Sequence, residues 1–83
     1  MLEFKFDTQL LIEGEGLDED AINDYIREHI KGDCLLVVGG DDLVKIHIHT
    51  NEPWQVLEYC AGLGDVFDIV VENMERQENG LQG

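Results

Sequence analysis

The sequence predicts a small α+β domain in which two helices cover one face of a four-stranded antiparallel sheet. Four stretches show the alternation or the short apolar run of strands, and two carry apolar residues three and four positions apart, as helices do. Glycines or capping residues separate these stretches. Their order is strand, helix, strand, strand, helix, strand, which favours two helices packed on one face of a sheet.

The first half of the chain is expected to hold one strand and one helix. Residues 3–14 predict a strand, because Phe4, Phe6, Thr8, Leu10 and Ile12 alternate with Lys5, Asp7, Gln9 and Leu11. Residues 17–32 predict a helix with Asp18 as its N-cap and Gly32 as its C-cap. The buried stripe of this helix is expected to comprise Ala21, Ile22, Tyr25, Ile26 and Ile30.

The second half is expected to hold a hairpin, a helix and a last strand. Residues 34–40 and 43–50 predict the two strands of the hairpin. Asn51 is expected to cap the helix, which has Pro53 in its first turn, ends at Gly64 and buries Val56, Leu57, Cys60, Ala61 and Leu63. Residues 66–74 predict the last strand, so residues 1–76 are expected to form one domain and residues 77–83 a flexible tail.

This order of elements is that of the ferredoxin-like βαββαβ sandwich, in which the first and third strands are central neighbours. In VKIHIHT, residues 44–50, the apolar residues are expected to face the helices, so His47 and His49 lie together on the open face. Asp7 is expected on the same open face, on the neighbouring first strand. Two imidazoles and a carboxylate are a three-ligand set for zinc that leaves a fourth position open. The alternative is that both histidines are solvated or buried against another subunit.

Charge and cysteine content exclude several kinds of partner and location. Nineteen Asp and Glu against five Lys and Arg give a net charge of −14, which repels nucleic acid and anionic membrane surfaces. The apolar runs are too short for insertion into a membrane. Cys34 and Cys60 form no disulfide or CxxC pattern and are expected to be core residues, which favours a cytoplasmic protein.

Two longer strings carry a family resemblance: GDCLLVVGGDDLVKIHIHTNEPWQVLEY and GDVFDIVVENMERQ. They resemble the middle domain of the bacterial fatty-acid kinase ATP-binding subunit, whose N-terminal part is similar to the dihydroxyacetone kinase nucleotide-binding domain. Members of that family carry GDSLVVVGDDDLVKVHVHT, a proline-led helix ending in tyrosine, and an NMREQ-like stretch. Their first strand, YCTEFLIEG, corresponds to FKFDTQLLIEG here. The resemblance covers residues 4–77, and Trp54 departs from it where glycine is usual.

The resemblance implies a non-catalytic middle domain of a larger kinase that uses ATP and magnesium in its kinase domain. The whole protein would phosphorylate a fatty acid presented by a DegV-like carrier protein, and the acyl phosphate would feed phospholipid synthesis. This segment would lie between the kinase and carrier-binding domains and help form a homodimer. The family is thought to hold a metal through a first-strand cysteine and the two histidines matched by His47 and His49. Asp7 stands in place of that cysteine. A carboxylate can ligate zinc, but it is a harder donor than a thiolate.

Two other functions would use the same residues differently. A small-molecule-sensing regulatory (ACT-like) domain has the same βαββαβ order and binds effectors at a dimer interface. An autonomous zinc hydrolase would use the open coordination position, but it needs a sheltered cleft that 83 residues barely supply. We expect no kinase activity from the chain alone, because Gly39-Gly40 lacks the spacing and the lysine of a phosphate-binding loop.

Overall fold

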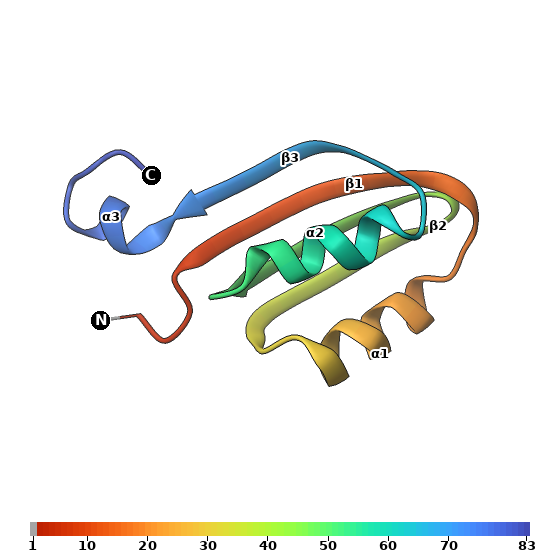
Figure 1. The fold of residues 1–83 in the computed structure, drawn as a ribbon, viewed down its shortest axis with the longest axis horizontal. Helices are drawn as coiled ribbons and strands as arrows, with labels where there is room; N and C mark the ends of the chain where they lie inside the picture. The colour runs from red at the N-terminus through yellow and green to blue at the C-terminus, as the bar shows by residue number, and fades with distance from the viewer. Residues whose placement is uncertain (1) are drawn as a thin grey trace.

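A computed structural model describes residues 2–83 and shows a three-stranded antiparallel sheet with three helices (Figure 1). In chain order the elements are β1 (Phe6–Leu17), α1 (Glu19–His29), β2 (Gly32–Thr50), α2 (Pro53–Ala61), β3 (Asp65–Asn73) and α3 (Met74–Glu78). The strand order is β2-β1-β3. Residue 1, the first of the predicted domain, lies outside the described residues. Within residues 2–83, no helix combines the length and the apolar character needed to cross a membrane.

The predicted four-stranded ferredoxin-like βαββαβ sandwich is wrong. Residues 34–40 and 43–50, expected as two strands, belong to the single strand β2, which runs through the expected turn without a break. A third helix, α3, also forms within the C-terminal segment, where none was expected. The small-molecule-sensing alternative rested on the same βαββαβ order and loses that basis.

The long strand β2 folds back on itself. A straight strand of its 19 residues would span about 60 Å, whereas the longest dimension of the molecule is 41 Å. The bend lies near Gly39 and Asp41, which have φ angles of +125° and +51°, and Figure 1 shows the two halves of β2 running side by side. The Thr50 hydroxyl at its end donates to the Lys31 carbonyl just before its start, over 2.7 Å. Only the second half of β2 and Asp41 pair with β1.

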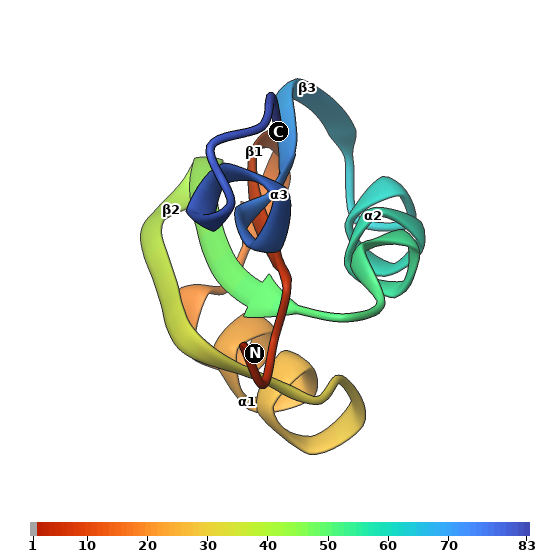
Figure 2. The ribbon, with the colours of Figure 1, turned by 90° about the vertical axis from the view of Figure 1, so that its left-hand side faces the viewer.

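The core lies between the sheet and the helices α1 and α2. Helix α1 packs on β2, and α2 packs on β1 and β3 (Figure 2). Burial follows the predicted alternation in β1 and in the second half of β2, and the fully buried side chains include Leu10, Ile12, Ile26, Val44, Ile46, Ile48, Val56 and Cys60. Ala21, Tyr25 and Ala61, which the predicted helical stripes included, are exposed. The burial of one side of each strand leaves the other side as the open face of the sheet.

Helix α1 begins as predicted and ends differently. The Asp18 carboxylate accepts hydrogen bonds from the backbone N–H groups of Asp20 and Ala21, at 3.0 and 3.1 Å, and so caps the helix. Ile30, rather than Gly32, is its C-cap. Gly32 instead begins β2, where an added Cβ would lie only 2.5 Å from the His49 carbonyl oxygen. The close approach of the two halves of β2 therefore explains this glycine.

Helix α2 has Pro53 in its first turn, as predicted, but Asn51 does not cap it. Glu52 is the N-cap and makes no side-chain capping bond. The Asn51 side chain turns to the N-terminal segment, where it accepts from the Lys5 N–H and donates to the Glu3 carbonyl, both over 2.9 Å. A residue expected to start a helix thus ties the beginning of the chain to the end of β2.

Substitutions at the bend of β2 give a test of this fold. Gly39→Ala should destabilise the chain by roughly 1–3 kcal/mol from the backbone conformation alone, and more because the added Cβ would lie 2.3 Å from the Leu43 carbonyl oxygen. The neighbouring Gly40→Ala is the matched control, since no atom lies within 4 Å of its Cβ position. Urea unfolding followed by circular dichroism measures both. Equal stability of the two variants would contradict the bend described here.

Candidate metal centre

The site forms on the open face because β1 and β2 pair antiparallel in a defined register. Asp7 lies directly opposite His49, and Gln9 lies opposite His47. Paired residues on neighbouring strands point to the same face, and the apolar residues between them are buried under the helices. The register therefore brings Asp7, His47 and His49 together, as the sequence predicted.

The three side chains are close enough to share one ion. Their ligand atoms all lie within 4.8 Å of one another. Nε2 of His47 lies 2.9 Å from Oδ1 of Asp7, and the rings of His47 and His49 meet edge to face with centroids 4.9 Å apart. The three side chains are about a quarter exposed, at 21% for Asp7, 26% for His47 and 24% for His49. They are thus largely sheltered but still open to an ion from solvent.

Gln9 supports the carboxylate of this group. Its amide Nε2 lies 3.3 and 3.4 Å from the two carboxylate oxygens of Asp7 and donates to them. Asp7 is therefore contacted by Gln9 from its own strand and by His47 from the next. Residues that orient a metal-binding side chain in this way are a regular part of metal sites. The strand alternation predicts Gln9 on this face but does not indicate its role.

A second group of donors also includes His49, and the sequence pattern did not predict it. Nδ1 of His49 lies 3.6 Å from Oδ1 of Asp33, and ligand atoms of Asp33, Cys34 and His49 lie within 4.8 Å of one another. Cys34 was expected in the core but is exposed. Its φ of +53° is left-handed, which breaks the strand alternation that would turn Asp33 and Cys34 to opposite faces. No pattern in the sequence signals that conformation.

The other cysteine behaves as expected. Cys60 has no exposed surface and belongs to the core. Burial raises the pKa of its thiol to about 12, because the thiolate would lose its solvation there. The two free cysteines are therefore chemically distinct, with Cys60 held as an apolar thiol and Cys34 accessible to reagents and ions.

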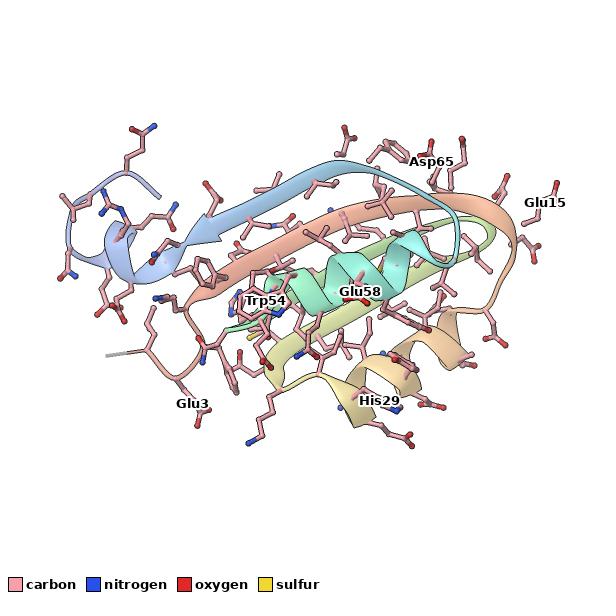
Figure 3. The ribbon with its side chains drawn as sticks, in the orientation of Figure 1. Glu3, Glu15, His29, Trp54, Glu58 and Asp65 are labelled. Carbon is pink, nitrogen blue, oxygen red and sulfur yellow. The ribbon has the colours of Figure 1, made fainter. Side chains whose placement is uncertain are left out.

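A hollow of about 530 Å³ lies between α1 and α2, on the opposite side of the sheet from the site. Tyr25 stacks on His29 and on Tyr59, with ring centroids 4.0 and 3.8 Å apart. Figure 3 shows Trp54 and Glu58 on α2 and His29 on α1 around this region. Burial, with smaller contributions from Cys60 and Tyr25, raises the pKa of Tyr59. The stack joins α1 to α2 through Tyr25 and Tyr59, so Tyr25 contributes to packing as predicted, although it is exposed rather than buried.

Comparison with known proteins agrees with the resemblance seen in the sequence. The family model for the middle domain of FakA-like fatty acid kinase subunits matches residues 3–81. Protein YloV of Bacillus subtilis is 32% identical over 82 residues, which cover 96% of this chain and 15% of that protein. An uncharacterised protein of Staphylococcus epidermidis is 44% identical over 63 residues, covering 76% of this chain and 11% of that protein. The chain thus spans a small part of the length of these relatives.

The family match extends over nearly all the described residues and includes both strands that form the site. The Staphylococcus haemolyticus relative is also 44% identical, over 46 residues that cover 55% of this chain and 8% of that protein. Matches of this extent go well beyond the His-x-His pattern alone. The chain belongs to the FakA-like family of fatty acid kinase subunits, and it corresponds to the middle domain of that family.

Proposed function

We propose that this chain is a metal-binding, non-catalytic middle domain of a fatty-acid-kinase-like protein, and that Asp7, His47 and His49 hold a zinc ion. The observation that carries the proposal is the convergence of these three ligand atoms within 4.8 Å on the open face. Imidazole nitrogens and a carboxylate oxygen are ordinary zinc ligands, and the fourth position is left for water or a residue of another domain.

The ion would act mainly on stability and on the shape of the open face. Asp7 belongs to β1 and the histidines to β2, so an ion bound by all three cross-links the two strands that carry most of the core. The chain has a net charge of −14, and a divalent cation lowers the mutual repulsion of its carboxylates. Metal ligation of this kind adds binding free energy to folding free energy.

In the whole protein, the domain would couple a kinase domain that uses ATP and magnesium to a domain that binds a DegV-like fatty-acid carrier. This part of the proposal rests on membership of the family and concerns a protein of which the chain is a small part. Gly39 and Gly40 lack the spacing and the lysine of a phosphate-binding loop, and they lie at the bend of β2 rather than before a helix. Phosphoryl transfer is therefore assigned to the rest of the protein.

The homodimer is proposed to form through the open-face apolar patch, defined here as Leu11, Leu43, Phe67 and Val70. Each of these residues belongs to β1 or pairs with a β1 residue that points to the open face, so all four lie on the face that carries the proposed metal site. Leu43, Phe67 and Val70 are 44%, 37% and 42% exposed, and grouped apolar residues of this kind mark interaction surfaces. The free edge of β3 is less suited, because a bulge at Asp68, with φ of +50° and a register shift, interrupts it.

Metal content tests the zinc site. The chain, prepared without a polyhistidine tag, should carry close to one zinc per molecule by elemental analysis. Zinc at a hundred times its dissociation constant should raise the melting temperature by on the order of 10–20 °C, since binding adds about 2.7 kcal/mol to a domain of this size. A chelator should reverse the shift. An Asp7→Ala, His47→Ala, His49→Ala triple variant should lose both effects.

His29→Gln is the control for this experiment, because His29 lies on α1 and belongs to the Tyr25 stack rather than to the site. It should bind zinc like the unaltered chain. Unchanged zinc binding by the triple variant would contradict the proposed site. Absence of zinc binding by the unaltered chain at millimolar zinc would contradict it as well.

Self-association tests the dimer. Two copies with a charge of −14 each repel one another, so sedimentation velocity should show dimerisation strengthening as salt rises and the screening length falls from about 8 Å to about 3 Å. Val70→Glu should weaken the dimer at least tenfold, about 1.4 kcal/mol, because it places an unpaired charge in an apolar contact. Leu81→Glu adds the same charge at the exposed C-terminal segment and is the control. Equal effects of the two substitutions would exclude this contact.

A further inference from the structure

Cys34 lies within reach of the histidine that the proposed zinc site uses. Its sulfur, a carboxylate oxygen of Asp33 and a ring nitrogen of His49 lie within 4.8 Å of one another. The ring atom of His49 nearest to Asp33 is Nδ1, 3.6 Å from Oδ1. His49 also belongs to the group formed with Asp7 and His47. One imidazole therefore stands between two groups of donors.

The two groups differ in chemical hardness. The group of Asp7, His47 and His49 offers oxygen and nitrogen donors only. The group of Asp33, Cys34 and His49 adds a sulfur, and thiolates select soft or borderline ions such as zinc, cadmium and monovalent copper over hard ones. Cysteine, histidine and aspartate are all common ligands of zinc. Sulfur therefore distinguishes the second group as a site with its own metal preference.

We propose that Asp33, Cys34 and His49 form a second, thiolate-containing metal site that shares His49 with the zinc site, and that Cys34 is a direct ligand there. On binding, the Cys34 S–H bond breaks, its sulfur forms a bond to the divalent ion, and the proton passes to solvent. No electron is transferred. Because the sites share a ligand, an ion in one competes for His49 with an ion in the other, and softer ions favour the Cys34 side.

The surroundings of Cys34 suit this role. Asp33 and Cys34 are exposed and His49 is partly buried, so an ion can enter from solvent. It would meet His49 held in place by its neighbours, and two exposed side chains, Asp33 and Cys34, that can adjust to it. The partly buried ring of His49 lies beside Asp33 and meets the His47 ring edge to face. The inference deepens the proposed metal-binding function. It rests on that function only in that both sites use His49 as a ligand.

Cobalt substitution tests the proposal directly, because a cobalt–thiolate bond gives a charge-transfer band in the near ultraviolet that oxygen and nitrogen ligands do not give. Titration of the untagged, fully reduced chain with Co²⁺ should produce this band. Cys34→Ser should abolish it. Cys60→Ser is the matched control and should leave the band unchanged, because Cys60 is fully buried.

Further variants separate this inference from the proposed zinc site. Asp7→Asn and His47→Gln should keep the thiolate band while weakening binding at the first site, whereas His49→Gln should weaken both at least tenfold. Cobalt binding without a thiolate band, sensitive to Asp7 and His47, would overturn the second site and leave the first intact. A thiolate band with no effect of Asp7→Asn or His47→Gln would support the second site and overturn the first.

Protection from alkylation tests the same ligand without any substitution, which guards against a Cys34→Ser chain that folds poorly. Zinc or cadmium should slow the reaction of Cys34 with iodoacetamide at least tenfold, as measured by mass spectrometry of the modified peptide. Magnesium, a hard ion, should not protect it. Equal alkylation rates with and without saturating cadmium would overturn the role of Cys34.

Discussion

The in-register pairing of β1 with the second half of β2 is the constraint on which the rest of the structure depends. It places Leu10 opposite Ile46 and Asp7 opposite His49, so the same ladder fills the core on one face and brings the proposed metal ligands together on the other. A slip of one residue would turn the apolar side chains to solvent and the histidines under the helices. Because Ile46 and Ile48 are fully buried, such a slip is strongly disfavoured, and the core thereby holds the site in position.

The position of His49 gives the open face its chemical character. Its neighbours come from three places in the sequence: β1, the start of β2 and its own half of β2. The fold-back of β2 is what brings Asp33 and Cys34 to it, since the two ends of this strand meet at Thr50 and Lys31. The bend at Gly39 is therefore a requirement for the second donor group as well as for the shape of the sheet.

Membership of the FakA-like family of fatty acid kinase subunits places this acidic module within a much longer kind of protein. The two faces of its sheet then have separate uses. The helical side is closed by the apolar core and by the stack of Tyr59, Tyr25 and His29. The open face carries the group of Asp7, His47 and His49 and the exposed apolar patch, so the proposed ion binding and the proposed contact with a second copy would share that face.

Much of this arrangement could be predicted from local patterns. The alternation in β1 and β2, the stripe of α1, the Asp18 cap and the grouping of Asp7, His47 and His49 all follow from side-chain period and capping chemistry. The four-stranded sheet was wrong because the composition around Gly39 indicates a change of direction without showing whether the strand ends there or continues through the bend. Cys34 was misplaced because a left-handed φ at a non-glycine residue has no signature in the sequence.

The sequence by itself determined the alternating burial along β1 and the second half of β2, which face carries the histidines and which family the chain resembles, because these depend on residue type and local spacing. Only the tertiary structure decided that residues 32–50 form one folded-back strand, that Asn51 ties down the N-terminal segment, and that Cys34 and Asp33 meet His49. Those features depend on contacts between residues far apart in the chain. Their geometry is set by how the packed core brings the ends of β2 together, which local patterns do not encode.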